Sequence, residues 1–195
     1  GGIHRYNYAA AHQRTCQLAH ALKNMGIKEG DRVATLAWNG HRHFELYFAI
    51  SGIGSVCHTI NPRLFAYQIV YIINHANDRI LFLDTTFIPI ITPLLDRLPK
   101  DLKFVALCNR KDMPDCAIPN LECFEDMLAG QSNLFSWPSL DERSASALCY
   151  TSGTTGNPKG VLFSHRSTLL HTLGMMVFAA DVGLNSSAVV LPVVP

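Results

Sequence analysis

The sequence predicts an α/β protein, a layered structure built around a largely parallel β-sheet. Short apolar segments typical of buried strands alternate with longer amphipathic segments typical of helices, from the start of the chain to its end. This order implies βαβ units, which place successive strands in parallel and helices on the faces of the sheet. The chain has 195 residues, a length that suits one domain or one and a half.

The helices are predicted from apolar residues three or four positions apart, and the strands from short, continuous apolar runs. The side chains of Phe44, Tyr47 and Phe48 are expected to face inward, as is that of Tyr8. The hydroxyl of Ser164 is expected to cap the last helix. Helices are expected at residues 8–25, 41–51, 66–75, 87–98, 121–128 and 165–180, and strands at 32–38, 55–60, 79–84, 103–107, 145–150 and 161–163.

Composition and charge exclude several classes of protein. Hydrophobic residues make up 48% of the chain and charged residues 16%, a balance typical of a globular protein with a sizeable core. The net charge of +1 gives no electrostatic basis for binding nucleic acid or an anionic membrane. No segment reaches the roughly 18 to 20 uninterrupted apolar residues that a membrane span requires. We therefore expect neither nucleic acid as a partner nor a transmembrane segment.

The cysteines and histidines indicate neither disulfides nor a metal site. The six cysteines include no C-x-x-C pair, and several of them lie in apolar runs, where cysteine acts as a small core residue. Reduced thiols in a cytoplasmic protein are the expectation. His41 and His43 form the tightest histidine pair, but no third ligand follows at a recognisable spacing.

The most informative segment is residues 150–160, with the sequence Tyr-Thr-Ser-Gly-Thr-Thr-Gly-Asn-Pro-Lys-Gly. It contains three glycines, four Ser or Thr residues and one lysine within eleven positions. Glycines allow positive φ angles and let an anion approach the backbone closely. Successive amides can then form a concave nest for a polyphosphate, to which hydroxyls add adaptable donors and Lys159 adds a mobile positive charge.

Two better-known nucleotide loops are excluded by spacing. The P-loop of common NTPases needs glycine directly before its lysine and Ser or Thr directly after it. Here Pro158 precedes Lys159 and Gly160 follows it. The G-x-G-x-x-G spacing of a dinucleotide-binding loop is also absent. A flexible glycine-rich turn between two strands is the structural alternative to a phosphate loop.

Residues 150–160 resemble the signature loop of the adenylate-forming superfamily, which includes acyl-CoA synthetases, luciferases and the adenylation domains of peptide synthetases. The resemblance continues in residues 26–33, 39–40, 51–64 and 160–167, and thus covers nearly the whole chain. The segment Asn-Pro-Arg-Leu at 61–64 and Ser-His-Arg at 164–166 are similar to the fatty acyl-CoA synthetase branch. The resemblance implies that the chain is part of an AMP-forming fatty acid–CoA ligase.

Such enzymes first join a carboxylic acid to ATP as an acyl-adenylate and then transfer the acyl group to coenzyme A. The resemblance therefore implies ATP, magnesium and coenzyme A as cofactors or co-substrates, and a small carboxylic acid as substrate. It implies that Thr151 is also a magnesium ligand; the alternative is a threonine whose hydroxyl only hydrogen-bonds the loop backbone. The residues implied to bind the nucleotide phosphates are Thr151, Ser152, Gly153, Thr154, Thr155, Gly156, Lys159 and Gly160.

By this resemblance, residues 1–195 are expected to be a partial N-terminal AMP-binding domain, without the C-terminal domain that carries the catalytic lysine. Lys159 is not that lysine, so no catalytic residue is assigned in this chain, which is expected to be inactive alone. Two alternatives stay open. The parent could act on an aryl acid, a short thioether acid or an amino acid, or the chain could be a non-catalytic nucleotide-binding module.

Overall fold

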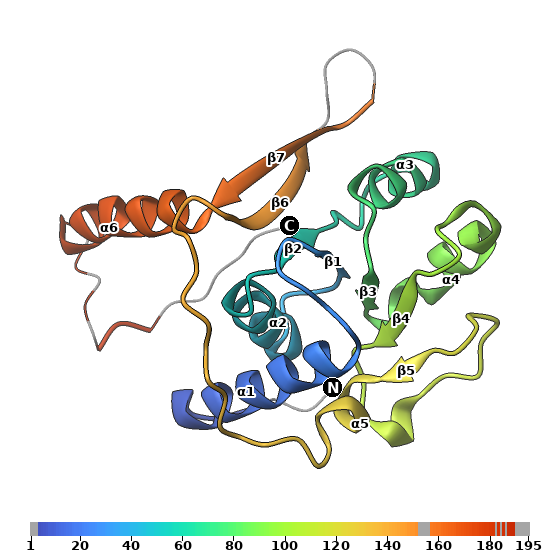
Figure 1. The fold of residues 1–195 in the computed structure, drawn as a ribbon, viewed down its shortest axis with the longest axis horizontal. Coiled ribbons are helices and arrows are strands. Elements are labelled where there is room, and N and C mark those ends of the chain that lie inside the picture. The colour runs from blue at the N-terminus through green and yellow to red at the C-terminus, as the bar shows by residue number, and fades with distance from the viewer. Residues whose placement is uncertain (1–3, 152–156, 182, 184, 186, 190–195) are drawn as a thin grey trace.

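The computed structural model describes residues 4–151, 157–181, 183, 185 and 187–189. Their seven strands form one sheet in the order β5-β4-β3-β1-β2-β6-β7 (Figure 1). Every neighbouring pair is parallel except β6 and β7, which are antiparallel. The prediction of an α/β fold with a largely parallel sheet is confirmed.

The elements lie close to the positions that the sequence predicts. The strands are β1 (Arg32–Leu36), β2 (Val56–Thr59), β3 (Ile80–Leu83), β4 (Lys103–Ala106), β5 (Glu122–Cys123), β6 (Ala145–Thr151) and β7 (Lys159–Ser164). The helices are α1 (Tyr8–Asn24), α2 (His41–Gly52), α3 (Ala66–Ala76), α4 (Ile88–Ile91), α5 (Phe124–Leu128) and α6 (His165–Asp181), with 3-10 turns η1 (Thr85–Phe87), η2 (Thr92–Arg97) and η3 (Arg110–Asp112).

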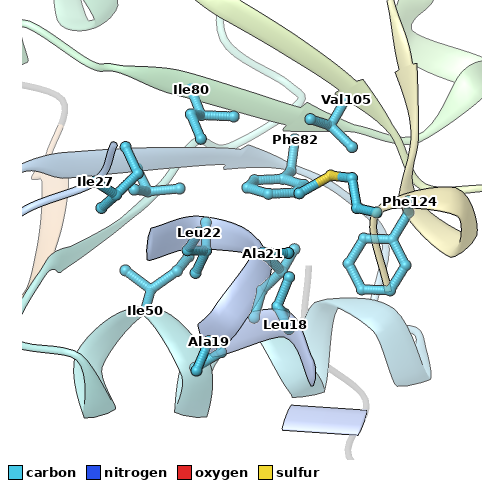
Figure 2. Packing of buried hydrophobic residues seen from close by; sticks show 14 of the residues in the cluster. Leu18, Ala19, Ala21, Leu22, Ile27, Ile50, Ile80, Phe82, Val105 and Phe124 are labelled. Atoms are coloured by element: carbon cyan, nitrogen blue, oxygen red, sulfur yellow. The ribbon is translucent and has the colours of Figure 1, made fainter. Parts of the chain in front are cut away.

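β1 lies inside the sheet between β3 and β2, and helices cover both faces of the sheet. β2 pairs with one side of β1 and β3 with the other. One face carries a core shared with α1, α2 and α5, in which Phe82 and Val105 of the sheet face Leu18 and Leu22 of α1 (Figure 2). The other face carries a second core, shared with α3, α4 and η2. Burial on both faces explains why the strands are continuous apolar runs.

The inward face of α2 is not the one expected from its aromatic residues. The side chains of Phe44, Tyr47 and Phe48 are all more than 40% exposed. The buried face instead contains two polar side chains, which are accommodated because each has a specific partner. Tyr8 of α1 is also exposed rather than inward, and it lines a groove of about 350 Å³ with Phe44, Phe48 and Trp137. The residues that α2 buries are His43, Glu45, Leu46, Ala49 and Ile50.

Two further elements differ from expectation. The helix predicted over residues 87–98 is a short α4 followed by the 3-10 turn η2. Pro89 and Pro93 each lack an amide hydrogen, which prevents a continuous ladder of helical hydrogen bonds. Residues 121–128 contain the two-residue strand β5 before helix α5, because Cys123 pairs with Ala106 at the edge of the sheet.

The end of the described chain follows the prediction closely. Residues 159–164 form a strand, and helix α6 begins directly after it. The hydroxyl of Ser164 accepts a hydrogen bond from the amide of Ser167 at 3.1 Å, as a capping serine does. None of the helices in the described part of the chain is long and apolar enough to cross a bilayer. The six cysteines are free thiols, and four of them are buried.

Gly52, the last residue of α2, is expected to tolerate no side chain. A Cβ atom at this position would lie 2.7 Å from Cζ3 of Trp137, which belongs to the connector between α5 and β6. Alanine normally favours a helix over glycine by roughly 1 kcal/mol, but displacement of the indole ring costs about 1–3 kcal/mol. We expect Gly52→Ala to lower the free energy of unfolding in urea titrations followed by tryptophan fluorescence. Gly174→Ala in α6, where the new methyl would have no neighbour within 4 Å, is the control. Equal unfolding midpoints for the two variants would contradict this account of Gly52.

Candidate functional site

The loop singled out by the sequence begins and ends on paired strands. Thr151 of β6 lies opposite Lys159 of β7, and Tyr150 lies opposite Gly160. The chain leaves the sheet after Thr151 and returns at Lys159, so the loop connects the two strands of a β-hairpin. A P-loop runs directly from a strand into a helix, whereas this loop runs into strand β7. The four residues Tyr150, Thr151, Lys159 and Gly160 are called the hairpin neck below.

The hairpin neck lies at the edge of the sheet where open α/β proteins bind their ligands. β6 is parallel to β2, and β2 is parallel to β1. β6 therefore ends at the same edge as the carboxyl ends of the central strands. Ligands of such sheets bind outside that edge. The fold thus brings the hairpin neck to the edge at which such sheets bind ligands.

The two residue pairs of the hairpin neck face opposite sides of the sheet. Because side chains alternate along a strand, Thr151 and Lys159 share one face, and Tyr150 and Gly160 share the other. The side chains of Thr151 and Lys159 are exposed. Directly opposite residues of antiparallel strands have Cβ atoms about 5 Å apart. The two exposed side chains therefore project from neighbouring positions on one face, and a hydroxyl and a positive charge are groups that suit a phosphate oxygen.

Gly160 does not need the positive φ angle expected for the glycines of this loop. It is an ordinary residue of β7 and is not among the residues with positive φ. A Cβ atom at Gly160 would lie 3.2 Å from Cζ of Tyr150 and 3.2 Å from Cδ1 of Leu148. Glycine therefore supplies room for these two side chains at this position.

The rest of the loop lies outside the described residues. This applies to Ser152, Gly153, Thr154, Thr155 and Gly156. Their expected contacts with nucleotide phosphates stay predictions, as do the phosphate contacts of Thr151, Lys159 and Gly160. Of the predicted site residues, the structure brings Thr151, Lys159 and Gly160 together at one neck.

The described residues offer no magnesium site made of protein ligands alone, and the chemistry of the hairpin neck is compatible with a magnesium ion that is bound mainly by ATP. Among the described residues, no group of three or more His, Cys, Asp or Glu is placed to hold a metal ion. Magnesium bound to ATP takes most of its ligands from phosphates and water, so one exposed hydroxyl such as that of Thr151 is sufficient. The histidine pair has other contacts: His43 is hydrogen-bonded to Thr35 at 3.0 Å, and His41 stacks on His4. Burial, followed by the charge of Arg42, lowers the pKa of His41 to about 4.

The structure adds residues that the sequence does not reveal. The hydroxyl of Tyr150 lies 2.6 Å from Nδ1 of His75 on α3. Beneath it, His58 of β2 and Asp78, which precedes β3, form a buried pair. Burial, aided by the charges of Asp78 and Tyr71, raises the pKa of Tyr150 to about 12, so its hydroxyl is protonated at neutral pH. These residues come from three separate segments, namely β2, the end of α3 with the turn after it, and β6, and no local spacing connects the three.

Comparisons with known proteins point to one family. A sequence profile described as AMP-binding enzyme matches residues 1–195. A medium-chain-fatty-acid–CoA ligase of Ectopseudomonas oleovorans is 49% identical over 197 residues, which cover 100% of this chain and 36% of the relative. A 3-methylmercaptopropionyl-CoA ligase of Ruegeria pomeroyi is 48% identical over 195 residues, with the same two coverages. The chain thus spans about a third of the length of these relatives.

The fold is shared with the solved structure of a CoA ligase. The crystal structure of the anthranilate CoA ligase AuaEII in complex with anthranoyl-AMP superposes with a TM-score of 0.77 at 25% sequence identity. The superposition covers 84% of this chain and 30% of that one.

Proposed function

Because the chain belongs to the family of AMP-binding enzymes, we propose that it is the phosphate-binding part of an ATP-dependent fatty acid–CoA ligase. The longer enzyme activates a carboxylic acid as acyl-AMP, releases pyrophosphate, and transfers the acyl group to coenzyme A. The observation that carries the proposal is the hairpin neck, which presents Thr151 and Lys159 at the carboxyl edge of a parallel sheet. The 195-residue chain is proposed to be inactive on its own.

The chemistry of adenylation explains why these residue types are needed. A carboxylate approaches the α-phosphorus of ATP, so one anion must come close to a polyanion. Lys159 lowers this repulsion with its positive charge, and the amides and hydroxyls of residues 151–156 donate hydrogen bonds to the phosphate oxygens. Magnesium, held in part by Thr151, would add positive charge to the phosphates. In this proposal, the chain's own residues bind and orient the leaving pyrophosphate.

A fatty acid is the proposed substrate, and one alternative has specific support. The chain is 49% identical to a medium-chain-fatty-acid–CoA ligase and 48% identical to a 3-methylmercaptopropionyl-CoA ligase. These identities are too close to distinguish a fatty acid from a short thioether acid. The Asn61-Pro62-Arg63-Leu64 segment, which resembles the fatty acyl branch, favours the fatty acid.

The test is a substrate panel with the longer protein that contains the chain. Octanoate, hexadecanoate, 3-methylthiopropionate, benzoate and an amino acid are each supplied with ATP, magnesium and coenzyme A. We expect AMP and an acyl-CoA by mass spectrometry, with kcat/KM highest for a fatty acid. Preference for the thioether acid would favour the second candidate. Absence of AMP with every acid would leave the chain as a non-catalytic nucleotide-binding module.

Thr151 is proposed to contribute its hydroxyl to magnesium at the ATP phosphates. We expect Thr151→Ala to raise the magnesium concentration for half-maximal adenylation by about 5-fold, since one hydrogen-bonding or ligand group contributes about 1 kcal/mol net. Thr151→Ser, which keeps the hydroxyl, should retain most of the wild-type response. Thr172→Ala in α6 removes an exposed threonine away from the neck and serves as the control. A magnesium titration of Thr151→Ala that matches wild type would remove this role.

A cytoplasmic location is also proposed. Its support is the set of six free cysteines, which suits a reducing compartment. Cell fractionation that finds the protein in an oxidising compartment would contradict it.

A further inference from the structure

The ring of Tyr150 lies across the base of the phosphate loop. Tyr150 directly precedes Thr151, where the loop begins, and its partner on β7 is Gly160. A Cβ atom at Gly160 would lie 3.2 Å from Cζ and 3.3 Å from Cε1 of the tyrosine ring. The ring therefore covers the backbone of the strand by which the chain returns from the loop. One side chain contacts both strands of the hairpin neck.

The hydroxyl end and the other side of the same ring contact the body of the domain. The hydroxyl lies 2.6 Å from Nδ1 of His75 on α3, and the two rings meet nearly at right angles. The ring centroid of His58 lies 5.2 Å from that of Tyr150. His58 pairs with Leu148 in the sheet, two residues before Tyr150, so both aromatic rings lie on the face that α3 covers.

His58 is itself held in place by a buried partner. Its Nδ1 atom lies 2.8 Å from Oδ2 of Asp78, and both side chains have 0% exposure. Burial raises the pKa of Asp78, and the hydrogen bond from His58 opposes that rise. Arg32 holds the turn that carries Asp78, because its guanidinium donates to the carbonyls of Ala76 at 2.6 Å and Asn77 at 3.3 Å. The ring of Tyr150 thus rests on a fixed polar pair inside the domain.

We propose that Tyr150 is a positioning residue, which ties both strands of the hairpin neck to His75 and to the His58–Asp78 pair. The inference rests on the proposed function, in which the loop holds the phosphates of ATP. Tyr150 faces away from Thr151 and Lys159 and acts through them, by fixing the strand ends from which they project. Small displacements of binding groups have large kinetic effects, since about 1 Å of misplacement can cost 10²-fold in rate.

Two substitutions of Tyr150 separate the ring from the hydroxyl. Tyr150→Phe removes the contact with His75, and we expect it to raise KM for ATP about 3-fold, the loss of one hydrogen bond. Tyr150→Leu also removes the ring, and we expect it to raise KM for ATP about 10-fold. KM for the fatty acid should change less than about 2-fold. The control is Tyr67→Phe, at an exposed position in the first turn of α3. Equal changes in both KM values, or wild-type kinetics for Tyr150→Leu, would overturn the inference.

Gly160 supplies an independent test through a double-mutant cycle. Gly160→Ala should push the ring aside and raise KM for ATP about as much as Tyr150→Leu does. In a Tyr150→Leu background the same glycine change should have a clearly smaller effect, because the ring is gone and only Cδ1 of Leu148, also at 3.2 Å, still opposes the new methyl. Gly174→Ala, with open space around the new methyl, is the matched control. Additive effects of Gly160→Ala and Tyr150→Leu would contradict a shared mechanism.

A readout independent of activity is tryptic cleavage at the Lys159–Gly160 bond, followed by mass spectrometry. We expect cleavage several-fold faster in Tyr150→Leu than in wild type or Tyr67→Phe, because the neck is no longer held. If the wild-type protein forms acyl-AMP but Tyr150→Leu is cleaved at the same rate as wild type, the inference is overturned and the proposed function stands. A wild-type protein that turns over ATP with no carboxylic acid overturns the proposed function and the assignment of the loop together.

Discussion

Replacement of Arg14 by leucine is expected to destabilise the domain by about 3 kcal/mol, the lower end of the cost of breaking a buried ion pair. Arg14 of α1 bonds to two carboxylates, with Nε 2.7 Å from Oε1 of Glu45 and Nη1 3.0 Å from Oε2 of Glu125. The side chain of Glu45 has 0% exposure, so the variant leaves an unpaired carboxylate in the interior. Because Glu45 lies on α2 and Glu125 on α5, the same change removes the ion pairs that link α1 to these two helices.

Urea unfolding at neutral pH measures this effect, and Arg79→Leu is the matched control. Arg79 pairs with Asp101 at 2.7 Å, but the two side chains are 45% and 66% exposed. An exposed pair of this kind contributes about 0–1 kcal/mol. Losses of equal size in the two variants would show that Glu45 is not dependent on Arg14.

The pH dependence of the stability lost in Arg14→Leu follows from the lowered pKa of Glu125. Burial by itself would raise the pKa of Glu125, but hydrogen bonds from Arg14 and Arg42 outweigh burial and lower it below the ordinary 4.5. A carboxylate with a lowered pKa contributes stability above its unfolded pKa and loses it as pH falls through the folded value. The stability difference between wild type and Arg14→Leu is therefore expected to persist above pH 4.5 and to narrow in more acidic solution.

Gly156→Ala is expected to have the largest effect on catalysis. The residue lies outside the described part of the chain, so the expectation rests on the sequence of the loop. A Cβ atom at a position with positive φ costs about 1–2 kcal/mol, which corresponds to about 5- to 30-fold slower adenylation. Thr155→Ala should be milder, because water partly replaces a lost hydroxyl.

Lys159→Ala should fall between these two variants, and its effect should shrink as salt rises, because an exposed charge is screened. The assay is release of pyrophosphate in the presence of a fatty acid, with the longer protein that contains the chain. If Thr155→Ala proves far more damaging than Gly156→Ala, side-chain donors rather than backbone amides hold the phosphates.

The sequence was sufficient for the order of elements because each segment has one dominant period. It was insufficient for α2, where both faces are apolar enough to be buried. The face with Phe44 and Phe48 has the stronger aromatic pattern, yet the domain buries the face with Glu45. That choice depends on Arg14, which lies 31 positions away and pairs with Glu45 through space. A pattern within one helix contains no information about such a partner.

The candidate site shows the same limit. The hairpin neck could be predicted, because the loop and its two flanking strands are contiguous in sequence. The support beneath it could not, because His58, His75 and Asp78 meet Tyr150 only after the sheet and α3 are assembled. Gly160 illustrates the difference: its presence was noted with the loop, but its reason, room for a ring, is visible only in three dimensions.

The most direct test of the central claim is ATP–pyrophosphate exchange by the longer protein, measured with and without a fatty acid. The claim is that residues 150–160 hold the phosphates of ATP while a carboxylic acid is activated. The account predicts that radiolabelled pyrophosphate enters ATP only when magnesium and the fatty acid are both present, and that Gly156→Ala slows the exchange about 5- to 30-fold. Exchange that needs no carboxylic acid, no exchange with any acid, or undiminished exchange in Gly156→Ala would contradict it.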